Sequence, residues 1–371
     1  MGTNSELQKS DPGLGQGSGS PGACARRKVG TLKAEPVMID WNPGLSIYAS
    51  EEFLKAVGDE YGWLGGRDES GALRCVLPYT VVCKTMVRMV RFRVQTIPVG
   101  PELTVDEEKS FLNGALKCFR SLGADVVIPP ATNTIFRSYP DKAQAAPYGS
   151  HVIDLTPSED VLWANMHSKH RNVIRNATNK GVQVCTGLEY TEKAYELIRD
   201  TFKRSAMSFM DRNAFQRMVS SLGEYVKVFV AVSQGEIHGC AVIPFSRHCA
   251  YYAYGGSCAH PLSGATNLLQ WEAIRAFRAL GVQQYDFCGV RINPEKGSKA
   301  AGLEMYKERF GGKLIQGYMW KASLRPLKAA VYSLGVRVIR GGDIVDRERH
   351  KLAAFEEERR GLCNVVDRPG A

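Results

Sequence analysis

The sequence predicts a mixed α/β protein with two domains, in which central sheets are flanked by helices. The first observation is length, since 371 residues leave room for about two domains of ~150 residues each. The second is an apolar content of 44%, which is enough to form real cores. The third is the alternation of strand-like runs with helical stretches in both halves of the chain, which is typical of sheets covered by helices.

Composition divides the chain into four segments. The stretch from Asp11 to Gly22 is rich in Gly, Ser and Pro, and it cannot bury enough apolar surface to offset the entropy of ordering. The last residues are helical in pattern and densely charged from Arg347 to Arg360. We therefore expect a disordered leader, an N-terminal domain, a C-terminal domain and a charged helical tail, at residues 1–35, 36–149, 150–324 and 325–371 respectively.

The N-terminal domain has the pattern of a small α/β unit. Its clearest signal is a capping box before helix 105–121, in which Thr104 accepts from the amide of Glu107 and the Glu107 side chain reaches back. Arg88, Arg91 and Arg93 alternate with apolar residues and predict a basic side on one strand. The expected elements are a helix after Ser50 at 51–57, strands at 72–79, 86–92 and 124–128, and the helix at 105–121.

The C-terminal domain has a longer series of elements. A cap at Thr156, proline at the first helical position and Glu159 open a helix that ends at Gly181, and Asp211 is a further cap. The order β-α-α-α-β-β-β-α-β-α-β resembles that of the GNAT acyltransferase fold, which is an analogy of fold alone. We expect strands at 150–155, 225–232, 237–246, 249–254, 283–287 and 313–321, and helices at 156–181, 192–207, 212–222, 264–280 and 300–310.

Charge and cysteine usage narrow the class of protein. The formal net charge of +10 favours a polyanionic partner, such as nucleic acid or a phosphorylated substrate. Ten cysteines occur without a Cys-x-x-Cys pair, so free thiols in a reducing cytosol are favoured over disulfides or zinc. No apolar run approaches the ~20 residues of a membrane span, and no secretory signal is visible. We expect a cytoplasmic protein, with peripheral membrane contact left open and no prediction of oligomeric state.

Two familiar kinds of catalytic site are absent from the sequence. His167 and His170 are neighbours on one helical face, but no carboxylate or cysteine completes a zinc set, so no metal site is expected. Neither a Ser-His-Asp set nor a nucleophile elbow is visible. Instead, segments 251–257, 284–289 and 304–312 each end an apolar run in glycine, aromatic and polar residues. Strand ends that line a cleft have this composition.

These segments carry a family resemblance. Residues 162–177, 285–290 and 302–312 resemble signatures of the FemABX family, and Pro98-Val99-Gly100-Pro101 is similar to its N-terminal half. In this order the motifs cover about residues 40–321. The resemblance implies two tandem GNAT-like domains that move an amino acid from aminoacyl-tRNA to an amine of a peptide or muropeptide acceptor. It implies no metal or redox cofactor.

The resemblance also implies catalytic residues. Tyr306 and Lys307 match an aromatic–lysine pair that handles the tRNA end, with Lys307 the candidate to stabilise the developing oxyanion or the tRNA 3′ terminus. An exposed helix lysine is the ordinary alternative. Asp286 at a strand end is a candidate to orient the amine, and a structural carboxylate is its alternative.

Binding residues follow from the same motifs. Arg204, or its neighbour Lys203, lies where the family places a basic residue against the acceptor's phosphates, and a solvated helix face is the alternative for both. The candidates at the cleft edge are Tyr254, Gly255 and Ser257, for which a tight turn is the alternative. The candidates for the tRNA backbone are Lys169, Arg171 and Arg175, for which a solvated helix face is the alternative.

Two other functions compete. A CoA-dependent N-acyltransferase needs an Arg/Gln-x-x-Gly-x-Gly/Ala loop to cradle the pyrophosphate. The equivalent segment here, His260–Thr266, lacks the leading residue and the second glycine, which favours another donor. The other competing hypothesis is a non-catalytic RNA- or tRNA-binding protein on an acyltransferase fold. No heptad-patterned insertion is present, so the coiled-coil arm of some family members is absent.

Overall fold

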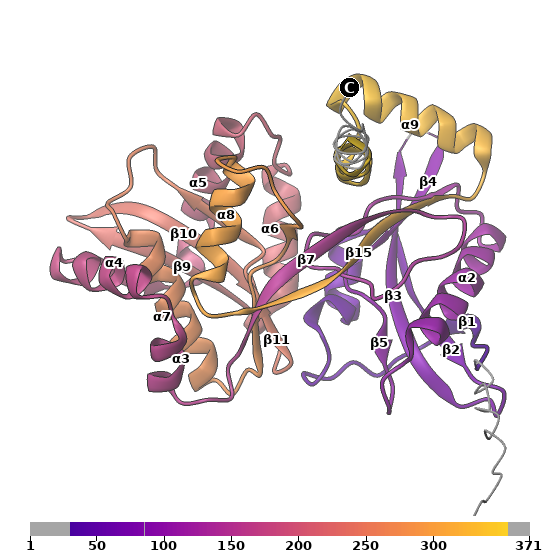
Figure 1. Ribbon diagram of the computed structural model, residues 1–371, viewed down its shortest axis with the longest axis horizontal. Coiled ribbons are helices and arrows are strands. Elements are labelled where there is room, and N and C mark those ends of the chain that lie inside the picture. Colours follow the sequence, from indigo (N-terminus) through magenta and orange to yellow (C-terminus); the bar gives the residue numbers. More distant parts are fainter. Residues whose placement is uncertain (1–29, 85, 355–371) are drawn as a thin grey trace, which may run out of the picture.

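Two lobes joined by a pair of long strands make up the protein (Figure 1). The computed structural model describes residues 30–84 and 86–354. Strands β7 (Gln144–Asp154) and β15 (Lys313–Ser323) run antiparallel between the lobes and share nine residue pairs. Because the last two residues of β15 pair with β6 (Val126–Val127), the sheet of the N-terminal half continues into the C-terminal half. The boundary expected at residue 150 falls inside β7.

The N-terminal half packs one long helix on a sheet. The capping box predicted for this helix is present, with Thr104 accepting from the Glu107 amide and the Glu107 carboxylate accepting from Thr104. Phe111 and Phe119 of the helix are buried against the sheet. The elements are β1 (Lys33–Val37), η1 (Ile47–Ala49), α1 (Glu51–Val57), β2 (Glu60–Arg67), β3 (Leu73–Lys84), β4 (Val87–Phe92), β5 (Ile97–Pro98) and α2 (Val105–Ser121).

The rest of the chain supplies the remaining elements, which belong to the C-terminal half except for α9, which packs on the N-terminal half. They are α3 (Glu159–Asn165), α4 (Ser168–Asn179), β8 (Gln183–Thr186), η2 (Leu188–Tyr190), α5 (Thr191–Arg204), α6 (Arg212–Leu222), η3 (Gly223–Tyr225), β9 (Val226–Ser233), β10 (Glu236–Pro244), β11 (Cys249–Tyr251), β12 (Tyr254–Ser257), α7 (Ala265–Ala279), β13 (Gln284–Asp286), β14 (Val290–Arg291), α8 (Lys299–Glu308) and α9 (Pro326–Arg340). The predicted cap Asp211 accepts from the amide of Ala214, and Gly223 ends α6.

Two sheets result from this order. Within the described residues the larger sheet has 11 strands. Nine follow the path β1-β2-β3-β4-β6-β15-β7-β13-β11, while β5 pairs with β3 and β14 with β7 beside it; the smaller sheet has the order β12-β10-β9-β8. One face of the smaller sheet packs on α5 and α6 through Val230 and Val242. Its other face packs on α4 and α7 through Ala231 and Ile243. The smaller sheet is therefore covered on both faces.

One predicted helix was wrong. Residues 156–181 form two helices, and the first is capped by Ser158 rather than Thr156, whose amide and hydroxyl instead bond to the Asp154 carboxylate. The first helix ends at Met166, whose backbone is extended (ψ 139°) and whose side chain is buried in the core. The following residue, His167, then donates its amide to the carbonyl of Arg309 at the end of α8.

One predicted strand was also wrong, because residues 249–254 do not form a single strand. Chain segment 249–251 is β11, which pairs in parallel with β13 in the larger sheet. After a sharp turn closed by the Ala253 amide on the Tyr251 carbonyl, β12 pairs with β10 in the smaller sheet. This segment crosses from one sheet to the other, and the two sheets diverge there.

The two terminal segments are described in part. The expected leader lies outside the described residues as far as residue 29, and β1 begins inside its remaining part at Lys33. In the expected tail, α9 and a second stretch at 344–354 are helical, and residues 355–371 lie outside the description. No described helix is long and apolar enough to cross a membrane.

Candidate active site

Lys307 on α8 is buried, with 4% of its surface exposed. Its ammonium donates to two backbone carbonyls, those of Cys288 at 2.9 Å and Gly289 at 2.6 Å. Burial lowers the pKa of this ammonium to about 8, because the charged form is poorly solvated there. The arrangement is therefore a fixed cation with a readily lost proton, rather than the exposed helix lysine that was the alternative.

The turn that receives Lys307 has an unusual backbone. Cys288 and Gly289 both adopt left-handed conformations, with φ of 51° and 80°. The Asp286 carboxylate holds this turn by accepting from the Cys288 amide at 2.7 Å and from the Ser150 hydroxyl. Burial raises the pKa of Asp286, while these two donors and Lys307 lower it. Asp286 thus positions the carbonyls that hold Lys307.

Tyr306 lies on a different side of α8 from Lys307. Its hydroxyl donates to the Thr266 carbonyl at 3.2 Å, in the first turn of α7, and its own carbonyl contacts the His170 ring at 3.0 Å. Burial raises the pKa of the Tyr306 phenol well above its ordinary value. Adjacent side chains on a helix point about 100° apart. Tyr306 therefore reaches α7, whereas Lys307 reaches the turn at Cys288 and Gly289.

The candidates on β12 contact side chains of α5, of α6 and of the loop between them. The Tyr254 hydroxyl donates to the Met218 sulfur at 3.7 Å, and its ring contacts Phe209. Arg204 donates to the Ser257 carbonyl at 2.6 Å, so these two candidates are brought together. Gly255 is closely covered, since a Cβ there would meet the Tyr252 hydroxyl. Lys203 is exposed on α5.

Arg93 is a further residue at this place. Its guanidinium donates to the Val57 carbonyl at 2.9 Å, and burial together with Arg91 lowers its pKa to about 9. The Tyr254 and Tyr48 phenols act on the same guanidinium electrostatically. A cation of the N-terminal half therefore lies beside the β12 candidates of the C-terminal half. The alternating arginines of the sequence were the only signal for it.

The three candidates for tRNA contact lie on or beside α4 with different surroundings. Lys169 is exposed at the start of the helix. Arg171 donates to the Ala164 carbonyl at 2.9 Å and to the Met166 carbonyl, so it caps the end of α3. Arg175 is exposed, with its guanidinium carbon 5.4 Å from the centroid of the Trp163 ring.

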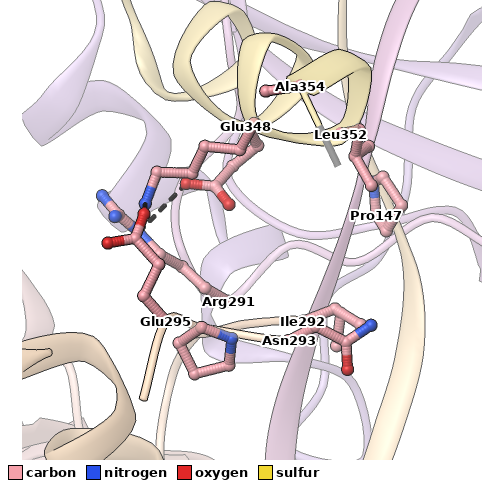
Figure 2. Close-up of a pocket in the computed structure, with 10 residues that line it drawn as sticks. Pro147, Arg291, Ile292, Asn293, Glu295, Glu348, Leu352 and Ala354 are labelled. Carbon is pink, nitrogen blue, oxygen red and sulfur yellow. Dashed lines mark ion pairs between the residues drawn. The ribbon is translucent and has the colours of Figure 1, made fainter. Parts of the chain in front are cut away.

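The loop that follows the Lys307 turn lines a separate cavity of about 340 Å³. Figure 2 shows it between residues 291–295 and the helical stretch 344–354. Two ion pairs cross it, Arg291 with Glu348 at 3.1 Å and Lys351 with Glu295 at 3.2 Å. None of the candidate catalytic or binding residues lines this cavity. Among the described residues, no group of three His, Cys, Asp or Glu side chains is placed to hold a metal ion.

Comparison with known proteins places this geometry in a fold. Residues 164–308 match the family model described as acetyltransferase (GNAT) domain. The chain is similar to the crystal structure of FemX, with a TM-score of 0.59 and 14% identity over 80% of this chain and 99% of that one. This similarity confirms the FemABX-like fold of tandem GNAT-like units predicted from the sequence.

Two further solved structures are similar at lower scores. L-PGS from Bacillus licheniformis gives a TM-score of 0.45 and 10% identity over 76% of this chain and 89% of that one. A tandem GNAT protein from the clavulanic acid biosynthesis pathway gives 0.42 and 12% over 72% and 83%. No curated protein matches the chain.

Proposed function

We propose that this protein is a cytoplasmic transferase that moves an amino acid from aminoacyl-tRNA to an amine of a peptide, such as a peptidoglycan precursor or a peptide natural product. The observation that carries the proposal is the buried ammonium of Lys307 in a FemX-like fold. The net charge of +10 suits a polyanionic donor.

The chemistry requires little beyond placement and charge compensation. The acceptor amine attacks the ester carbonyl of the aminoacyl-tRNA and forms a tetrahedral oxyanion. The oxyanion collapses as the ester C–O bond breaks, and the departing tRNA 3′ oxygen takes up the proton that the amine loses. Within the described part of the chain, two of the three N–H donors of Lys307 have an acceptor. The third is available to the oxyanion or to the departing 3′ oxygen.

The other side chains have supporting roles in this proposal. Asp286 positions the turn that fixes Lys307, and Tyr306 reaches the first turn of α7. We propose that the acceptor contacts Arg204 of α5 and three residues of β12, namely Tyr254, Gly255 and Ser257. The exposed Lys203 is the neighbouring cation. Lys169, Arg171 and Arg175 are proposed to meet the tRNA backbone.

A CoA-dependent N-acyltransferase is the second candidate, because the GNAT family match includes the segment before α7 that holds CoA phosphates in such enzymes. The test is a transfer assay with a pool of charged tRNAs, radiolabelled amino acids and candidate peptide amines. We expect label in a new amide bond, and no heat of binding when acetyl-CoA is titrated into the protein. Tight acetyl-CoA binding would contradict the tRNA-dependent function.

The pH dependence of transfer distinguishes a cationic from a basic Lys307. With a pKa of about 8, the ammonium is charged below that pH and neutral above it. If the cation stabilises the oxyanion, the transfer rate falls as pH rises through about 8, whereas a base would give a rise. Lys307→Arg keeps its charge at high pH and should lack this decline. Because the acceptor amine must also lose its proton, the comparison of the two chains decides: equal pH profiles for the parent chain and Lys307→Arg would refute the cationic role.

A further inference from the structure

Helix α9 presents an apolar stripe to the outside of the molecule. Leu327, Val331, Leu334 and Val338 are 86%, 68%, 64% and 76% exposed. Their spacing of four, three and four residues places them on one helical face. The opposite face packs on the N-terminal half, where Ala329 is buried beside β4 and β6. In Figure 1 the helix lies along the outer edge of that half.

The charged residues of the helix and its two ends are all basic, and the nearest carboxylates, Asp125 and Asp346, belong to other segments. Residues 325–342 contain four basic residues and no acidic one, namely Arg325, Lys328, Arg337 and Arg340. Lys328 and Arg325 approach the buried Asp125 carboxylate, at 3.3 and 3.6 Å. Arg337 is exposed. On a helical wheel, Arg337 and Lys328 lie on opposite flanks of the stripe.

We propose that this face of α9 docks on the surface of an anionic lipid bilayer. Such helices lie in the interface with apolar side chains buried ~5–10 Å, while flanking Lys and Arg meet anionic headgroups. Met86, at the turn between β3 and β4, is 77% exposed and adds to this surface. It adjoins α9, because Lys328 donates to the Met86 carbonyl at 3.0 Å. The inference rests on α9 and is independent of the proposed function.

Charge favours a bilayer over a second copy of the chain. A symmetric dimer through this stripe would bury two copies of the same basic patch in one interface. The surface of an anionic bilayer complements those cations. A helix of 15 residues is about 22 Å long, less than the ~30 Å of a hydrocarbon core, so α9 fits along the surface.

A groove with both apolar and charged lining, including Lys84 and Asp211, runs along one flank of the helix. It has a volume of about 920 Å³ and is also lined by Val331, Val336 and Ile339 of α9 and by Met89 of β4. Its far side is formed by the loop before α6, including Phe209, whose ring contacts Tyr254. A bilayer on the outer face of α9 would therefore lie next to a groove that reaches the junction of the two halves.

Flotation of the full chain with lipid vesicles tests the proposal. We expect binding to vesicles of phosphatidylcholine mixed with phosphatidylglycerol, several-fold weaker binding to phosphatidylcholine alone, and weakening by salt. The double variant Val331→Glu with Val338→Glu should lower binding at least about tenfold. The control Leu188→Glu with Leu280→Glu adds the same charge at exposed leucines outside α9 and should bind like the parent chain.

Three outcomes would overturn the inference. Equal binding of the α9 double variant and the control would mean that the stripe does not contact lipid. A dimer in light scattering that the α9 variant abolishes, without vesicle binding, would assign the face to a second copy. A lower melting temperature of the α9 variant, without vesicle binding, would mean that another segment of the chain covers the stripe.

Discussion

Lys307→Ala is expected to lower the rate of aminoacyl transfer by about 10²–10³-fold, the usual loss when one fixed donor to an oxyanion is removed. The reason lies in the surroundings of the ammonium. The carbonyls of Cys288 and Gly289 hold it in place before the substrate arrives, and burial strengthens its field. A cation placed in this way needs no reorganisation as negative charge develops.

The kinetic constants separate this role from a loss of folding. Since Lys307 is proposed to act on the transition state, kcat should fall while KM changes little. Lys299→Ala, which removes an exposed lysine from the same helix, is the matched control and should retain activity. Circular dichroism checks that both variants are folded. Unchanged transfer by a folded Lys307→Ala chain would refute the assignment.

Elements with a local signal were predicted well. The Thr104–Glu107 box and the Asp211 cap depend on residues three positions apart, and both are present. The break at Met166 has one local contact, in which the His167 ring accepts from the Lys169 amide, but it also involves burial of Met166 and a bond from His167 to Arg309, far along the chain. Tertiary contacts of this kind override the helical pattern of the sequence.

The candidate site shows the same division. The motifs located Lys307 and Asp286, which lie in one cluster. They did not indicate Ser150, which bonds to Asp286 across 136 residues, or the carbonyls that hold Lys307. Backbone acceptors leave no mark on residue identity. A left-handed φ does affect residue identity, because it favours glycine and other residues adopt it at a cost.

Gly289→Ala is expected to reduce the free energy of unfolding by about 3 kcal/mol and to abolish most transfer activity. At its φ of 80°, a Cβ would lie 2.5 Å from the Tyr148 hydroxyl and 2.9 Å from the Thr132 carbonyl. Relief of these contacts would move the carbonyl that accepts from Lys307. Urea denaturation measures the loss of unfolding free energy. If the slope of that free energy against urea concentration is unchanged, the loss arises in the native state.

Gly297→Ala and Tyr148→Phe divide this loss into its causes. Gly297 has a similar φ of 76° with no atom near its missing Cβ, so its alanine variant should lose only the ~1 kcal/mol of backbone strain. Tyr148→Phe removes the oxygen closest to the new methyl group, so the double variant with Gly289→Ala should lose less than the sum of the single variants. Additive losses, or equal losses at Gly289 and Gly297, would mean that the Lys307 turn is not held by close packing against Tyr148.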